Sequence, residues 1–300
     1  MRVAITGSSG MVGRALAEAL RRRGDEVVRV VRSFRDVSSR ERVVVWQPDR
    51  GQVEAAKFEG VDAVVHLAGE SIAGVWTPGK KRAIYQSRAK GTTLLARALA
   101  ERREKPAVLV SMSGVNYYGS NRGDEPLTEA SPPGEGFMAN VTRAWEQSAD
   151  PAREAGIRVV HPRTAPIFSP KGGMLKVVLP LYRLGLGARL GSGEQYMPWI
   201  ALEDVVGALL FFLDRPDIAG AVNLVAPDFV TNAELNAELA RAVNRPSVLK
   251  APAFALRLAP GAMGEELLLG GLKVIPKVLQ DAGFGWKQPR LREALGAMLV

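Results

Sequence analysis

The stretch that decides the fold is RVAITGSSGMVG, residues 2–13 of a chain of 300 residues. It begins as a short apolar run, which is typical of a buried strand, and it ends in Gly7, Gly10 and Gly13. Residues 11–24 then show apolar side chains at helical spacing and stop at a glycine. A strand, a glycine turn and a helix in this order predict a phosphate-binding turn. Glycine tolerates positive φ and leaves no Cβ in the path of a diphosphate.

The first half of the chain repeats the alternation of strand and helix. Apolar, β-branched runs alternate with helical patterns at 80–103 and 140–155. The runs lie at 26–32, 43–46, 62–69, 107–113 and 157–163. Strands that are apolar throughout and separated by helices predict a parallel sheet covered on both faces. We therefore expect an α/β fold, a doubly wound Rossmann sheet over residues 1–165, which a strand and helix from about 200–225 can join.

The second half of the chain has a different pattern of predicted elements. Glycine and proline become denser after residue 165, and the elements become shorter and less regular. We expect a smaller α+β lobe over residues 166–300, on the substrate side, that ends in a helical closing segment. No Ser/Gly/Pro-rich linker separates the two parts, so we expect them to pack closely.

Composition excludes several classes of function. The chain has no cysteine and only His66 and His161, so neither disulfides nor a metal site are expected. No apolar run reaches the length of a membrane span. The net charge of +9 is spread along the chain and is interpreted as a solubilising surface. We expect a cytoplasmic monomer or homodimer that takes a small-molecule substrate and binds neither nucleic acid nor membrane.

The end of the second strand indicates which nucleotide would bind. An NAD site usually has an acidic residue there for the ribose 2′-hydroxyl, but this strand ends in Arg32 and Ser33. Asp25 and Glu26 lie at the opposite end of the strand. Arg32 can pair with a 2′-phosphate, Ser33 can donate a hydrogen bond, and Arg35 is near in sequence. These residues favour NADP(H) over NAD(H).

Three further stretches carry a family resemblance: HLAG at 66–69, RAKGT at 88–92 and SMSGVNYYG at 111–119. Together with the glycine turn they resemble the extended, epimerase-like branch of the short-chain dehydrogenase/reductase superfamily. The resemblance and the end of the second strand imply a set of cofactor contacts. These are Gly7, Ser9, Gly10, Met11, Val12, Gly13, Arg32, Ser33, Leu67, Ala68, Gly69, Arg88 and Ser111.

The resemblance extends over nearly the whole chain and narrows to one atypical subfamily, usually called "epimerase family protein". GESI at 69–72, SPKGGML at 169–175, LGSGEQ at 190–195 and the residues from 264 to 295 are similar to its motifs, including a small C-terminal closing domain. Two positions depart from the pattern. Ala201 stands where histidine is usual, and glycine is usual around Ala165. Both positions are expected to border the substrate pocket.

The proton-transfer pair of the superfamily is missing. Extended reductases carry Tyr-x-x-x-Lys on the helix after the fifth strand, and the aligned positions here hold Met138 and Thr142. Replacement catalysts are Ser113, Tyr117 or Tyr118 in the loop after that strand, or Glu70. The alternatives are hydride transfer without a side-chain acid, or no turnover at all.

The sequence therefore supports two functions. The first is an NADP(H)-dependent oxidoreductase or epimerase-like protein that acts on a nucleotide sugar or a carbonyl compound. The second is a non-catalytic NADP(H) sensor or regulator, for example one related to cell division.

Overall fold

A computed structural model describes residues 1–33, 42–258 and 262–299 of the protein. Its centre is a nine-stranded sheet in the order β13-β9-β6-β5-β1-β2-β3-β4, with β7 also paired to β9. All pairs are parallel except β3 with β4. The strands are β1 (Arg2–Thr6), β2 (Glu26–Val31), β3 (Val43–Gln47), β4 (Gln52–Val53), β5 (Ala63–His66), β6 (Val108–Ser111), β7 (Ser113–Gly114), β9 (Arg158–Thr164) and β13 (Gly220–Leu224). The predicted doubly wound parallel sheet is confirmed.

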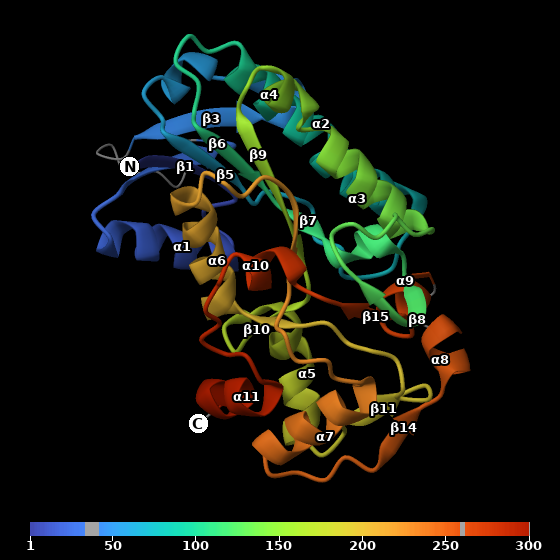
Figure 1. Cartoon of the computed structure of the whole chain (residues 1–300). Coiled ribbons are helices and arrows are strands. Elements are labelled where there is room, and N and C mark those ends of the chain that lie inside the picture. The colour runs from blue at the N-terminus through green and yellow to red at the C-terminus, as the bar shows by residue number, and fades with distance from the viewer. Residues whose placement is uncertain (34–41, 259–261, 300) are drawn as a thin grey trace.

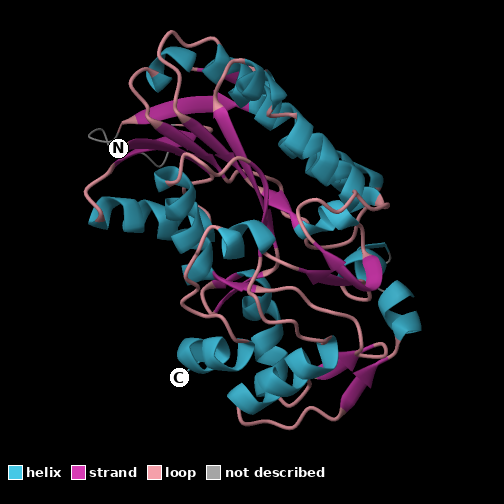
Figure 2. Ribbon diagram, in the orientation of Figure 1, coloured by secondary structure: helices cyan, strands magenta, loops and turns pink. Residues whose placement is uncertain are grey.

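Helices cover both faces of the sheet (Figure 1 and Figure 2). On one face lie α1 (Met11–Arg22) and α6 (Leu202–Asp214), and on the other α2 (Pro78–Ala100), α3 (Phe137–Gln147) and α4 (Asp150–Glu154). The side chains of β1 alternate between the faces, because Val3 and Ile5 pack with Leu16 of α1, whereas Ala4 packs with Leu95 of α2. This two-sided burial explains why the strands are apolar throughout. Short 3-10 turns are η1 (Pro48–Arg50), η2 (Ala55–Phe58) and η3 (Val115–Tyr118).

Two prolines shape this layer. The sequence predicted one helix over 140–155, but α3 ends at Gln147 and α4 begins at Asp150. Pro151 has no N–H for the carbonyl four residues earlier, and its ring would clash there, so the helix breaks. Pro162 lies within β9, where β6 pairs with residues 158–160 and β7 with Arg163 and Thr164. The gap between β6 and β7 thus falls opposite the residue that cannot donate to a ladder.

The chain returns to the large sheet after residue 200. Helix α6 packs beside α1, and β13 pairs in parallel with β9, from Gly220 opposite Val160 to Leu224 opposite Thr164. Arg158 of β9 connects this strand to α6 and to the loop before β13, because its guanidinium donates to the carbonyls of Phe212 and Ile218.

The remaining elements form a smaller lobe beside the sheet (Figure 1). Three two-stranded ribbons pair β8 (Asn121–Leu127) with β15 (Gly271–Val274), β10 (Ile167–Ser169) with β12 (Ile200–Ala201), and β11 (Ala188–Leu190) with β14 (Leu249–Ala251). The helices are α5 (Gly173–Arg183), α7 (Asn232–Ala242), α8 (Ala253–Leu258), α9 (Ala262–Leu267), α10 (Lys277–Asp281) and α11 (Leu291–Leu299). Phe168, Leu175, Trp199, Leu235 and Leu295 contribute to a separate core in this lobe. None of the helices in the described part of the chain is long and apolar enough to cross a membrane.

Candidate functional site

The predicted glycine turn joins β1 to α1. Gly7 has a φ of +64°, and its carbonyl accepts from the Gly10 N–H at 2.9 Å. A Cβ on Gly13 would lie 2.3 Å from the Gly7 oxygen, so only glycine fits there without a shift. No side chain caps the N-terminus of α1, and its first turn holds no acidic residue. Ser9 and Gly10 are exposed, and Met11 and Val12 are half-buried. The turn therefore presents helix N–H groups to an anion.

A buried histidine holds the neighbouring loop against this turn. The Thr6 hydroxyl lies 2.7 Å from His66 Nδ1 and accepts from the N–H groups of Leu67 and Ala68. His66 Nε2 lies 3.0 Å from Thr92 Oγ1. Burial lowers the pKa of His66 to about 4, so the ring is neutral and braces β1, β5 and α2. Its burial and hydrogen bonds leave His66 no role as a base.

Arg32, Ser33 and Glu70 lie near this loop as exposed residues. Lys80 Nζ is 2.7 Å from Glu70 Oε1 and lowers the pKa of Glu70, and the charges of Arg32 and Arg88 lower it further. Glu70 is thus a carboxylate surrounded by cations, which makes it a weak base. Arg35, the other predicted phosphate contact, lies outside the described residues. We call the Gly7–Gly13 turn, Arg32, Ser33 and residues 67–70 the glycine end of the site.

Several buried polar atoms near these elements have no protein partner: Arg88 Nε, Ser111 Oγ and the indole nitrogens of Trp46 and Trp145. Arg88 is 8% exposed, and its Nη1 donates to the carbonyls of Glu70 and Ile84 at 3.0 and 3.2 Å, but its Nε makes no hydrogen bond. Its guanidinium lies 4.8 Å from the Trp145 ring and 3.5 Å from where a Gly69 Cβ would be. Ser111 Oγ, at the end of β6, is also buried without a partner. Orphaned donors of this kind fit a ligand rich in oxygen acceptors.

A buried ion pair lies at the ends of β7 and β9. Ser113 Oγ donates to Glu146 Oε1 at 2.7 Å. Arg163 grips the same carboxylate with two bonds, Nε to Oε1 at 2.9 Å and Nη2 to Oε2 at 3.0 Å. Burial alone would lower the pKa of Arg163, but the Glu146 carboxylate outweighs it and raises that pKa. The pair therefore stays charged and fixes the direction of the Ser113 hydroxyl.

The two candidate tyrosines pack around this ion pair. The Tyr117 ring lies 3.4 Å from Arg163 Cζ and is half-buried. Tyr118 is fully buried; its hydroxyl lies 2.6 Å from Asn223 Oδ1 and accepts from Arg163 Nη1 at 3.0 Å. Burial raises the pKa of Tyr118 to about 12. Burial and these hydrogen bonds give Tyr118 a structural role in this arrangement, and its role as a proton carrier stays a prediction. We call Ser113, Tyr117, Tyr118, Glu146 and Arg163 the serine end of the site.

Helix α3 confirms that no substitute pair occupies the expected positions. Met138 and Thr142 are both buried, and the Thr142 hydroxyl donates to the Met138 carbonyl of its own helix. The N–H groups of Phe137 and Met138 donate to the Glu266 carboxylate of α9 at 3.1 and 3.0 Å. The start of α3 thus serves as a docking point for the C-terminal segment.

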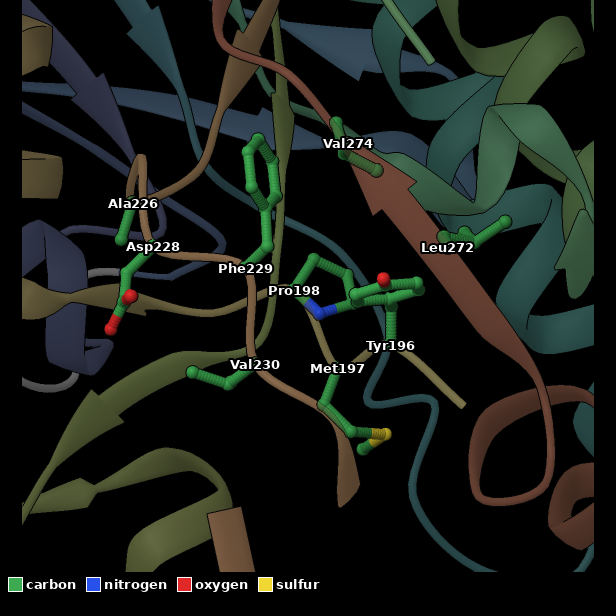
Figure 3. A pocket seen from close by; sticks show the side chains of 9 residues that line it. All are labelled: Tyr196, Met197, Pro198, Ala226, Asp228, Phe229, Val230, Leu272 and Val274. Carbon is green, nitrogen blue, oxygen red and sulfur yellow. The ribbon is translucent and has the colours of Figure 1, made fainter. Parts of the chain in front are cut away.

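A small, partly open pocket lies in the smaller lobe (Figure 3). Its lining comes from residues 196–198, from residues 226–230 and from β15. It contains none of the predicted site residues. Ala165 and Ala201 are buried in the two cores and do not line this pocket, and their place beside a substrate pocket stays a prediction.

Sequence reasoning missed Glu146 and Arg163. One signal was available for each. Arg163 is a charged residue in the buried part of a strand, and Glu146 lies four and eight residues after Thr142 and Met138, on the same side of α3. Of the four candidate catalysts, the structure gathers Ser113, Tyr117 and Tyr118 at the serine end and leaves Glu70 at the glycine end.

Comparison with known proteins settles the family. A model of the NAD dependent epimerase/dehydratase family matches residues 3–225, well over half of the chain. The chain belongs to the NAD dependent epimerase/dehydratase family. A model described as a domain of unknown function, DUF1731, matches residues 251–298 of this family member. The resemblance that the sequence motifs indicated is therefore confirmed.

Relatives match this epimerase-family chain over its full length. An "epimerase family protein" of Mycobacterium bovis is 43% identical over 295 residues, 98% of this chain and 96% of the relative. The crystal structure of human epimerase family protein SDR39U1 with NADPH is similar with a TM-score of 0.87 and 32% identity, covering 100% of this chain and 99% of that one. A nucleoside-diphosphate sugar epimerase from Corynebacterium glutamicum has a TM-score of 0.83 and 33% identity, covering 100% of this chain and 58% of that one.

Proposed function

We propose that this protein binds NADP(H) and acts as an oxidoreductase or epimerase on a small molecule. The observation that carries the proposal is the uncapped N-terminus of α1 above the Gly7–Gly13 turn, with Arg32 at the end of β2. The helix N–H groups hold a diphosphate there, and Arg32 with Ser33 reaches the ribose 2′-phosphate. NADPH in the human relative's crystal structure supports the same choice of nucleotide.

Residues 1–165, together with α6 and β13, form the cofactor side in this proposal. Leu67, Ala68 and Gly69, directly after β5, would line the nucleotide, and the orphaned Arg88 Nε and Ser111 Oγ would bond its oxygens. A bound nicotinamide would supply hydride transfer. The serine end orients the reacting group, and residues 166–300 close the site on the substrate side.

The serine end determines what hydrogen bond a ligand receives. Because Ser113 gives its proton to Glu146, its oxygen offers lone pairs to a donor on the ligand, such as an alcohol. Ser113 is therefore the group we propose to face the substrate, with Glu146 and Arg163 as positioning residues. The substrate class is a nucleotide sugar or a carbonyl compound, which the name of the Corynebacterium relative supports.

Three observations favour a second function. The positions of the usual pair hold the buried Met138 and Thr142, and Tyr118 has no free hydroxyl. These three facts favour a protein that binds NADP(H) and regulates a partner without turnover.

Fluorescence titration of Arg32→Ala with NADPH and NADH tests the cofactor. A charge-assisted contact contributes about 1.5–3 kcal/mol, so NADPH affinity should fall by about tenfold or more, and NADH affinity should hardly change. Arg22→Ala is the matched control, because Arg22 is an exposed arginine of α1 that pairs with Glu18. Equal losses for both nucleotides in Arg32→Ala would refute the choice of NADP(H).

Turnover on a panel of carbonyl compounds and nucleotide sugars, followed by NADPH absorbance, separates the two functions. For an enzyme, Ser113→Ala should abolish turnover and leave NADPH affinity within about twofold, because the hydrogen bond of Ser113 is made to the substrate. Tight NADPH binding without turnover on the whole panel would support the regulator instead.

A further inference from the structure

Exposed apolar side chains gather on the smaller lobe. Of the twelve large hydrophobic side chains that are exposed among the described residues, eight come from residues 177–186 and 248–258. Val177 is 71% exposed, Leu184 72% and Val248 82%. Single exposed hydrophobic residues are ordinary, but a cluster of this kind marks an interaction surface.

The two segments form one surface. Val177, Leu181 and Leu184 follow helical spacing and lie on the outer face of α5 and its end, and the chain then turns into β11. Arg245 Nε donates to the Arg183 carbonyl at 3.0 Å, and Ser247 Oγ donates to the Gly187 carbonyl at 3.3 Å. Ala188 of β11 pairs with Leu249 of β14. We call this surface the small-lobe patch: Val177, Leu181, Leu184, Leu186, Val248 and Leu249.

The two segments that form the small-lobe patch carry charges of one sign. Residues 171–193 contain four lysines or arginines and residues 244–258 contain three, and neither segment contains an aspartate or glutamate. Lys176, Arg183 and Lys250 are exposed, and no ion pair among the described residues uses their side chains.

We propose that the small-lobe patch binds the surface of a lipid bilayer that contains anionic lipid. Apolar side chains enter the boundary between headgroups and acyl chains, and the surrounding lysines and arginines pair with lipid phosphates. Because no described helix can span a bilayer, the protein lies on the surface. Figure 1 shows β11 and β14 in the smaller lobe, away from α1 and α2. The N-terminus of α5 lies beside Met11 of α1, whereas the exposed side chains of the patch come from the rest of α5 and the residues after it.

Charge decides between a bilayer and a second copy of this chain as the occupant. A symmetric dimer through the small-lobe patch would bring the patch onto itself, and Lys176, Arg183 and Lys250 would face cations of the same kind. Like charges across an interface oppose association, whereas an anionic bilayer neutralises them.

Flotation with lipid vesicles tests the proposal. The full-length protein should float with vesicles of phosphatidylcholine containing about one-quarter phosphatidylglycerol and should not float with phosphatidylcholine alone. Leu184→Glu places a carboxylate in the small-lobe patch and should weaken the partition coefficient by about tenfold or more. Val75→Glu is the matched control, because Val75 is 64% exposed in the loop between β5 and α2 and the charge change is the same.

The control defines the results that would overturn the proposal. Equal losses in Leu184→Glu and Val75→Glu would assign vesicle binding to the net charge of +9 and not to the small-lobe patch. Absence of binding by the unmodified protein would also overturn it. A concentration-dependent dimer that Leu184→Glu dissociates, without any vesicle binding, would make the occupant a second copy. Circular dichroism checks that both variants fold.

Discussion

The glycine end and the serine end are built in different ways. At the glycine end, backbone groups form the site: Gly7 has a positive φ, Gly13 allows a close approach, and the N-terminus of α1 is uncapped. At the serine end, side chains do the work, through the pair of Glu146 and Arg163 beneath Ser113. The first arrangement tolerates few residue types but is local in sequence. The arrangement at the serine end depends on Ser113 of β7, Glu146 of α3 and Arg163 of β9. A substitution at one of these residues is limited by the contacts that it makes with the other two.

The largest effect is expected from breaking the serine end. Glu146→Gln leaves the Arg163 cation buried without a counter-charge, which typically costs about 3–5 kcal/mol of unfolding free energy. Urea denaturation measures the loss. Asp281→Asn is the control, because its pair with Lys277 is exposed and is screened by solvent. Equal effects in the two variants would show that the buried pair is not special.

The next largest effect is expected in the pH dependence of stability, which depends on the buried His66 beside the glycine turn. The folded pKa of His66 is about 4, below its ordinary value of 6.5. Between these values the unfolded state binds the extra proton, so stability falls as pH falls from about 6.5 to about 4, by up to about 3 kcal/mol in total. Unfolding free energy measured across this range should decline less steeply in His66→Gln. Parallel curves would exclude His66 as the source.

A smaller effect is expected from crowding the glycine turn. Gly13→Ala places a Cβ against the Gly7 carbonyl and should destabilise the protein by about 1–3 kcal/mol, with NADPH affinity reduced as well. Gly296→Ala in α11 is the control, because a Cβ there meets no atom within 4 Å. A variant Gly13→Ala that binds NADPH like the unmodified protein would argue against a diphosphate at this turn.

The smallest effect is expected at the N-terminus of α3, the helix that carries Glu146. Glu266→Gln removes the negative charge that accepts from the first N–H groups of α3, which is worth about 0.3–1 kcal/mol. Thermal unfolding of this variant should be compared with Glu104→Gln, a change at an exposed carboxylate. A loss several times larger would mean that Glu266 also holds the lobe in place.

The glycine end and the serine end also differ in how much of each could be predicted from the sequence. The alternating strands, the glycine turn and the place of Arg32 were predictable, because each depends on residues within one short stretch. The helical break at Pro151 was also visible in the sequence but was not used. The surroundings of Tyr118 could not be predicted, since its burial depends on Asn223 and Arg163, which lie far from it along the chain. The same distance hid Glu146 and Arg163 as partners of Ser113.

The pairing of β8 with β15 has a consequence for biosynthesis. Asn121 and Gly271 pair directly, and 150 residues separate them (271 − 121). At roughly 5–20 residues per second, β8 leaves the ribosome roughly 8–30 s before its partner exists, and its backbone edge is open to other chains during that interval. A transcript cut short before residue 271 would make this exposure permanent. The edge of β8 is therefore closed late, since a nascent chain can pair β8 with β15 only after residues 271–274 have been made.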